Sequence, residues 1–262
     1  MEDMGNYLSS KLSVENILMT VMKMPGVKIH RSQFLYKELI KYYAEDVVQK
    51  AIDFNPAKAG ISLNRINRIS LQVINYETIK ATGVSVAASL PSAEAGMLAL
   101  GAATADITSY FAFILRAVQE LAYLYGFYEF ELDENSIDTE MMNFIIIFLG
   151  VMFGASEATL VLAKFADIAA KHVSTTLARK ALTKGIVYPV VKKISSQIGI
   201  RMTKQVFADT VASAIPIAGM IASGGLTFAL FKPCCLKLRK NLMSYNLCKP
   251  EYYLSHDSFE II

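Results

Sequence analysis

Apolar side chains recur at helical spacing through much of the chain. Between positions 31 and 53 they return every three or four residues among lysines, acids and glutamines, which predicts one amphipathic helix. The Asn55-Pro56 pair ends this helix, because the residue before a proline disfavours the α region. Upstream, the Pro25-Gly26 turn signal ends a shorter helix over 13–23, and a further helix is predicted over 63–81. The residues that set the 31–53 spacing are Tyr36, Ile40, Tyr43, Val47 and Ala51.

The segment 106–126 has the clearest amphipathic pattern. Its polar face indicates a helix packed in protein rather than a membrane span. Arg116 and Glu120 lie four residues apart on that face, where an ion pair contributes a few tenths of a kcal/mol at most. With Asp106 they either face solvent or line a polar cavity. The apolar face consists of Ile107, Phe111, Ile114, Leu115, Val118, Leu121, Ala122 and Tyr125, and the polar face of Asp106, Ser109, Arg116, Gln119, Glu120 and Tyr123.

Residues 141–156 form an uncharged run of sixteen residues. As a helix this run is about 24 Å long, short of the ~30 Å hydrocarbon layer of a membrane. The four charged residues between Glu157 and Lys171 share one face, so we expect the helix to continue through them. Gly150 and Gly154 would let another helix approach closely, in a soluble core or in a membrane. Core packing is the favoured interpretation, and membrane contact is the alternative.

A second uncharged run covers the 22 residues from 210 to 231. As one helix it would be about 33 Å long, enough to cross a bilayer. Its strongly apolar residues favour insertion by roughly 3–5 kcal/mol, but Pro216, the glycines and the hydroxyl residues oppose it. A turn at Gly224-Gly225 would leave arms too short to cross. Basic residues at both ends give no orientation signal. We therefore expect a hairpin that is buried in protein or inserts shallowly into one leaflet.

The hypothesis of membrane contact assigns three groups of residues. The candidate membrane contacts are Ile215, Ile217, Met220, Ile221, Leu226, Phe228 and Phe231. Basic residues near an anionic lipid surface contribute about 1 kcal/mol each. The candidates for this role are Lys192, Lys193, Arg201, Lys204, Lys232, Lys237, Arg239 and Lys240. The glycines expected to allow close packing of helices are Gly150, Gly154, Gly219, Gly224 and Gly225.

Composition supports an all-α fold. Apolar residues make up 53% of the chain and charged residues 19%, while 14 glycines and 7 prolines are few for a β protein. We expect a compact multi-helix bundle with apolar Gly/Ala-rich helical hairpin segments and no substantial sheet. The predicted organisation is a lead-in over 1–20, a single helical domain over 21–247 and a C-terminal tail over 248–262. We expect this tail to be loose from Lys249 onward.

The N-terminus and the cysteines bear on the compartment. The first residues are acidic and lack an apolar stretch, so no secretory signal is visible. The three cysteines, two of them adjacent at Cys234-Cys235, do not form a disulfide framework, and a reducing cytoplasm is the simplest compartment. We expect the adjacent pair to be buried and inert, with acylation beside the apolar run as the alternative.

Charge is unevenly distributed along the chain. Eight Lys or Arg and no acids occur between 171 and 208, whereas six acids and no bases occur between 129 and 140. A basic block can face nucleic acid, anionic lipid or an acidic segment of the same chain. The block has little aromatic surface for stacking and no nucleic-acid signature, so we exclude nucleic acid as a partner. A solvated face partly neutralised by the 129–140 segment is the simplest interpretation.

No motif in the sequence indicates catalysis. The chain has no nucleophile elbow, no His-Glu-x-x-His, no phosphate-binding loop and no dinucleotide fingerprint. His30, His172 and His256 are far apart and are expected at the surface. We predict no enzymatic activity, no cofactor and no metal. An enzyme would require a site assembled from scattered residues.

Several short stretches together carry a family resemblance. They are Met24-Pro-Gly-Val-Lys-Ile29 with Arg31, Phe34 and Leu35; Gln119-Glu-Leu-Ala-Tyr-Leu-Tyr-Gly126; Leu182-Thr-Lys184 with Tyr188-Pro189; Ile215-Pro-Ile-Ala-Gly219; and Ser223-Gly-Gly-Leu-Thr227. In this combination the chain resembles the EcsC protein family of bacteria over roughly residues 20–245. The segment Leu90-Pro-Ser-Ala-Glu94 lacks the glycine pair expected after its proline. The resemblance implies a bacterial, membrane-related role beside an ABC exporter, and no catalytic residues.

These observations lead to one functional expectation and two alternatives. We expect a non-enzymatic accessory protein in the cytoplasm, peripheral to the inner face of the cell membrane. Its partners would be the anionic membrane surface and a membrane transporter or secretion complex. The first alternative is a membrane-perturbing, pore-forming effector. The second is a soluble helical carrier of a lipid or another apolar ligand.

Overall fold

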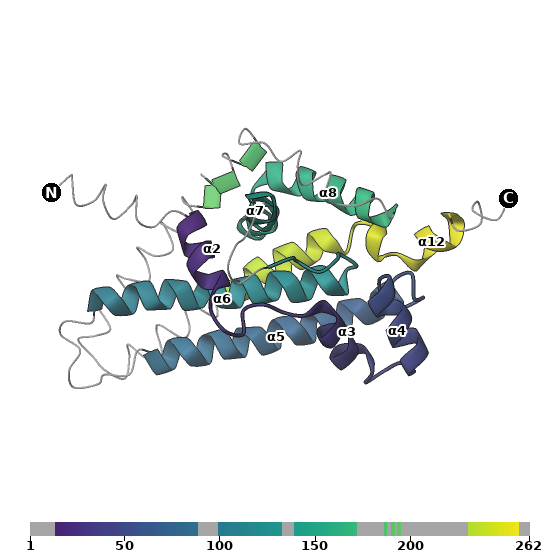
Figure 1. Ribbon diagram of the computed structural model, residues 1–262, viewed down its shortest axis with the longest axis horizontal. Coiled ribbons are helices and arrows are strands. Elements are labelled where there is room, and N and C mark those ends of the chain that lie inside the picture. Colours follow the sequence, from purple (N-terminus) through teal and green to yellow (C-terminus); the bar gives the residue numbers. More distant parts are fainter. Residues whose placement is uncertain are drawn as a thin grey trace.

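The regular structure of the protein is helical throughout the residues that can be described. The computed structural model describes residues 14–88, 99–132, 139–171 and 230–256, with the short helical stretches 186–187, 190–191 and 193–194 (Figure 1). No strand occurs among these residues, which confirms the all-α class. Among the same residues, no helix combines the length and the apolar character needed to cross a membrane.

Two long antiparallel helices form the spine of the bundle. α5 (Leu63–Ala88) and α6 (Ala99–Leu124) lie side by side along the long axis of the molecule (Figure 1). Both are longer than their predicted ranges of 63–81 and 106–126. The residues added to α6 include four alanines among 99–105, and alanine is the best helix former, whereas residues 82–88 of α5 include poorer helix formers such as Gly83 and Val84. The short helix α2 (Val14–Met22) packs against α6.

The predicted helix over 31–53 is in fact two helices, so that prediction is wrong. α3 (Arg31–Leu39) and α4 (Glu45–Asp53) are separated by a turn in which Ala44 has an extended backbone. Glu45 and Asp46 occupy the first turn of α4, where negative charge favours the N-terminus of a helix. The predicted apolar spacing does not mark the buried face: Tyr36 and Ile40 are exposed, whereas Leu39 and Val48 are buried.

The predicted long helix from 141 through 171 is also interrupted. α7 (Thr139–Phe153) and α8 (Ser156–Ala170) pack against each other as a helical hairpin. Gly154 has a φ of +82°. Its N–H donates to the carbonyl of Val151 at 3.1 Å, and the N–H of Ala155 donates to the carbonyl of Gly150 at 2.8 Å. This pair of bonds is a Schellman motif, which ends a helix at a glycine in the left-handed region. The charged face therefore belongs to a separate helix, α8.

Gly150 allows α7 to approach two other helical stretches. A Cβ atom at this position would lie 2.6 Å from the Cβ of Ala158 on α8 and would also collide with Val190. Such contacts are far shorter than side chains tolerate, so only glycine fits this backbone position. The residue that the sequence marked for close packing thus lies where α7 meets α8 and the 190–191 stretch.

An aromatic cluster joins α7 to the segment that follows α6. Phe144 and Phe148 of α7 have ring centroids 5.1 Å apart, and Phe130 lies 5.5 Å from Phe144. Phe127 lies 5.2 Å from Phe148, and Phe165 of α8 lies 4.9 Å from Phe144. These tilted and edge-to-face rings form the centre of the core.

The described C-terminal residues are also helical. The helical segment 230–242 is followed by the 3-10 helix η1 (Asn246–Cys248) and by α12 (Pro250–His256). Within the described residues, the stretch from Lys249 to His256 is therefore structured rather than loose. Tyr253 of α12 is buried, its hydroxyl donates to the carbonyl of Leu247 at 3.2 Å, and Asn55 donates to that hydroxyl at 3.0 Å.

We predict that Gly150→Ala destabilises the protein by about 2–3 kcal/mol, because overpacked cores must shift backbone or side chains. Gly60→Ala is the reference, since its φ of +81° carries strain but nothing lies within 4 Å of an added Cβ. We expect that variant to lose only about 1 kcal/mol. Urea unfolding followed by circular dichroism measures both. Equal losses of unfolding free energy in the two variants would show that a Cβ at Gly150 causes no overpacking of the core.

Candidate functional site

Most of the predicted membrane-contact run lies outside the described residues. Of its candidates only Phe231 is described. Its side chain is buried, and its ring makes an edge contact with Tyr110 at a centroid distance of 6.3 Å. The candidate residues outside the described part are Ile215, Ile217, Met220, Ile221, Leu226, Phe228, Gly219, Gly224, Gly225, Lys192, Arg201 and Lys204.

The other basic candidates occupy different environments. Lys193, Lys237 and Lys240 are exposed, and Lys232 is half-buried. Arg239 instead points into the protein. We call residues 230–242, which carry four of these five bases, the C-terminal basic helix.

Arg239 fastens the C-terminal basic helix to α5. Its Nε donates to the hydroxyl of Ser70 at 2.9 Å, and its Nη2 donates to the carbonyl of Asn67 at 3.3 Å. The hydroxyl of Tyr125, just after α6, donates to the side-chain oxygen of Asn67 at 2.7 Å and lies 3.0 Å from the Ser70 hydroxyl. Arg239 is therefore part of a polar junction among three helical segments and has a structural role.

The adjacent cysteines face the core. Cys234 and Cys235 are both buried, as the sequence analysis expected. Burial, with a smaller effect of Cys234, raises the pKa of the Cys235 thiol well above its ordinary value. Burial also raises the pKa of Cys248 to about 12. Because the thiolate is the reactive form, Cys235 and Cys248 are poor nucleophiles.

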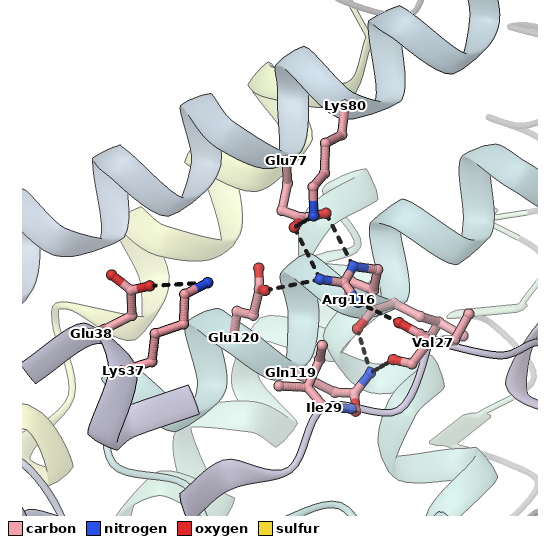
Figure 2. Close-up of polar contacts among 11 residues, drawn as sticks. Val27, Ile29, Lys37, Glu38, Glu77, Lys80, Arg116, Gln119 and Glu120 are labelled. Carbon is pink, nitrogen blue, oxygen red and sulfur yellow. Dashed lines mark hydrogen bonds and ion pairs between the residues drawn. The ribbon is translucent and has the colours of Figure 1, made fainter. Parts of the chain in front are cut away.

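The polar face of α6 contains a buried charge cluster, formed by Glu77, Arg116 and Glu120 (Figure 2). Glu77 of α5 is fully buried, and Arg116 donates to its two carboxylate oxygens from Nε and Nη2, each at 3.2 Å. The same Nη2 lies 3.5 Å from Glu120 Oε1, so the i,i+4 pair expected from the sequence is present. Lys80 lies 3.4 Å from Glu77. A bidentate Arg–carboxylate pair of this kind is strong and directional.

The segment that precedes α3 covers this polar face. Gln119 donates to the carbonyl of Val27 at 2.8 Å and accepts from the N–H of Ile29 at 2.9 Å. Arg116 donates to the carbonyl of Gly26. Gln119 and Glu120 are only 1% and 5% exposed, so a solvent-facing stripe is the wrong interpretation for them. Two of the stretches that carry the family resemblance, 24–29 and 119–126, are thus in direct contact.

Glu120 has an unusual electrostatic environment. Its Oε2 has no hydrogen-bond partner within the described part of the chain. The pKa of this carboxyl is raised to about 8, mainly by burial and also by the nearby Glu77, while Arg116 and Lys80 partly oppose the shift. At pH 7 the Glu120 carboxyl is therefore mainly protonated, and Arg116 forms its ion pair with Glu77.

Arg31 is a second buried cation, and it bonds backbone carbonyls only. Its guanidinium donates to Ile52 at 2.6 Å, Phe54 at 2.8 Å, Ala51 at 3.3 Å and Phe127 at 3.0 Å. The first three carbonyls lie at the C-terminal end of α4, where the helix dipole favours a positive charge. Burial lowers the pKa of Arg31 from its ordinary value. In the sequence, Arg31 stands out only as part of the family resemblance, and its role as the cap of α4 could not be predicted from that.

No protein-family model, curated protein or solved structure matches the chain. Any function must therefore be inferred from the chain's own residues. Among the residues that the structure describes, no three His, Cys, Asp or Glu side chains are grouped to hold a metal ion. The described surface instead carries exposed positive charge on packed helices.

We predict that Glu120 makes stability fall as the pH rises. The folded state holds this proton up to about pH 8, whereas the unfolded state releases it near 4.5, so the free energy of unfolding decreases between these values. Glu120→Gln stays neutral and should exceed the wild type by up to about 4 kcal/mol at pH 9, with little difference at pH 5. Urea unfolding from pH 5 to 9 tests this, with the exposed Glu45→Gln as control. Parallel pH profiles for wild type and Glu120→Gln would contradict the raised pKa.

We predict that Arg31→Lys lowers the free energy of unfolding by about 2–4 kcal/mol, because one ammonium group cannot reach the end of α4 and the Phe127 carbonyl together. Arg68→Lys, at an exposed position of α5, is the matched control and should change stability by less than about 0.5 kcal/mol. Thermal and urea unfolding measure both variants. An Arg31→Lys protein as stable as the control would show that the carbonyl bonds are dispensable.

Proposed function

We propose that this protein is a peripheral accessory protein that docks on the anionic cytoplasmic face of a bacterial membrane through the C-terminal basic helix. The observation that carries the proposal is the charge of residues 230–250, which include no acid. Lys237 and Lys240 are exposed, and neither has an acidic partner among the described residues. The bases of this stretch are Lys232, Lys237, Arg239, Lys240 and Lys249.

The inner face of the C-terminal basic helix keeps these lysines at the surface. Phe231, Leu238 and Leu242 are buried, and Arg239 bonds α5, so the helix cannot turn its lysines inward. A Cβ on Gly154 would lie 3.3 Å from the Lys237 ammonium, which places Lys237 beside the turn between α7 and α8. Val190 packs on Gly150, one turn away on α7. The exposed Lys193 therefore belongs to the same end of α7.

Anionic lipid is the partner that this arrangement favours. Each lysine near such a surface contributes about 1 kcal/mol, and the attraction weakens with salt because it is screened within a Debye length of about 10 Å. The resemblance to the EcsC family suggests a second partner at the membrane, which is a membrane transporter or secretion complex. In cells, we infer that a high-salt wash lowers the amount of the protein in the membrane fraction.

We predict that Lys237→Gln/Lys240→Gln weakens binding to anionic vesicles about 30-fold, which corresponds to ~2 kcal/mol for two bases. The measurement is co-sedimentation with vesicles of phosphatidylglycerol and phosphatidylcholine at low and high salt. Lys23→Gln/Lys50→Gln removes the same charge from exposed positions elsewhere and should change binding less. The proposal fails if the wild type does not sediment with anionic vesicles at low salt. The assignment to the basic helix fails if both double variants behave alike.

A further inference from the structure

Exposed apolar side chains gather on one side of the protein. Of the eleven large hydrophobic side chains that are exposed among the described residues, six belong to residues 36–42 and to α5. The most exposed of the six are Ile79 at 69% and Tyr76 at 54%. We call this surface the aromatic–basic face, and its apolar members are Tyr36, Ile40, Tyr42, Leu71, Tyr76 and Ile79.

Side-chain contacts join α5 to the chain segment beside it, so the face is continuous. The ammonium group of Lys37 lies 5.9 Å from the centre of the Tyr76 ring, and that of Lys80 lies 4.3 Å from the same ring. Further along α5, the Arg65 guanidinium stacks 4.7 Å from the centre of the Tyr42 ring. Ile79 follows Tyr76 by three residues and shares its side of the helix. In Figure 1, α5 forms one edge of the bundle.

The exposed charge of this face is positive. Between 63 and 81, α5 carries Arg65, Arg68 and Lys80 but only one acid, Glu77. Glu77 is fully buried and bonded to Arg116, so it does not reach the surface. On α3, Glu38 is also turned inward and only 8% exposed. Figure 2 shows both carboxylates, each with a lysine beside it.

We propose that the aromatic–basic face enters the interfacial layer of an anionic membrane, with α5 lying in the plane of the surface. Tyr76 and Ile79 would occupy the boundary between headgroups and acyl chains, while Arg65, Arg68 and Lys80 meet the lipid phosphates. Tyrosine is enriched at this depth, and amphipathic helices with basic flanks bind such surfaces. Long basic side chains cover apolar surface while their charged ends stay in water. This inference rests on the proposed function and names the surface that enters the bilayer.

Charge argues against a second copy of the chain as the occupant. Two copies that met through this face would bring Arg65, Arg68 and Lys80 of each against like charges, which is unfavourable. A lipid surface supplies many phosphates at once and an apolar layer just below them. The occupant that matches both the exposed bases and the exposed rings is therefore the membrane.

Tryptophan provides a specific probe of this face, because the chain has none. Ile79→Trp places one reporter on the face, and Leu160→Trp places one on α8 at a similar exposure of 68%. With phosphatidylglycerol vesicles that contain brominated lipid, we expect the emission of Ile79→Trp to shift to the blue and to be quenched at least about twofold. Leu160→Trp should show neither change. Equal responses from the two reporters would overturn the inference.

A binding measurement separates this inference from the proposed function. Tyr76→Ser/Ile79→Ser should weaken the partition into anionic vesicles about tenfold or more, because it removes apolar area from the interface. Met19→Ser/Leu160→Ser, which also removes two exposed apolar side chains, should not. If the wild type and both double variants bind with equal strength, the aromatic–basic face does not enter the membrane, and the proposed function is unaffected. A wild type that binds no vesicles would overturn both. A dimer seen by light scattering and abolished by Tyr76→Ser/Ile79→Ser would assign the face to a second copy instead.

Discussion

The paired contact between Arg116 and Glu77 is the interaction on which the rest of the structure depends. Glu77 is fully buried, and a buried carboxylate without a partner would destabilise the fold by about 3–5 kcal/mol. Arg116 supplies two hydrogen bonds to this carboxylate and one to the carbonyl of Gly26. The guanidinium therefore joins α5, α6 and the segment before α3 at one point. Gln119 extends that junction with two hydrogen bonds to the same segment: it donates to the carbonyl of Val27 and accepts from the N–H of Ile29.

The same junction explains why Glu120 is a protonated carboxyl rather than a second carboxylate. One guanidinium cannot compensate two buried negative charges at low dielectric, and Glu77 has the better geometry, with two bonds at 3.2 Å against one contact at 3.5 Å. The proton on Glu120 leaves the cluster close to neutral. Because Glu77 faces inward to satisfy Arg116, α5 has no acid on its outer side. The contact that holds the core together thus also leaves the outer surface of α5 positively charged.

Helical class and helix faces could be predicted from the sequence, whereas breaks and distant contacts could not. Apolar spacing located α6 and the Arg116–Glu120 pair, since both depend on residues three or four apart. It missed the break at Gly154, which is set by a local Schellman motif that does not disturb the apolar pattern. It left open whether Glu120 faces solvent or lines a polar cavity, because the segment that covers this face lies about ninety residues away in the chain. The predicted hairpin within 210–231 falls outside the described residues, except for its last two positions.

The two positively charged surfaces are mechanically connected, and this bears on how the protein would meet a membrane. Arg239 connects the C-terminal basic helix to Ser70 and Asn67 of α5 through two hydrogen bonds. Arg239 bonds the buried side of α5, at Ser70, whereas Lys237 lies beside the turn between α7 and α8. In the proposed docking, the basic helix would therefore act through long-range attraction, which falls off within a Debye length of about 8 Å. In this arrangement the apolar residues of α5 set the depth of docking, and the basic helix adds attraction that salt can weaken. In the proposed docking, the apolar residues of α5 would supply the part of the binding that salt does not weaken.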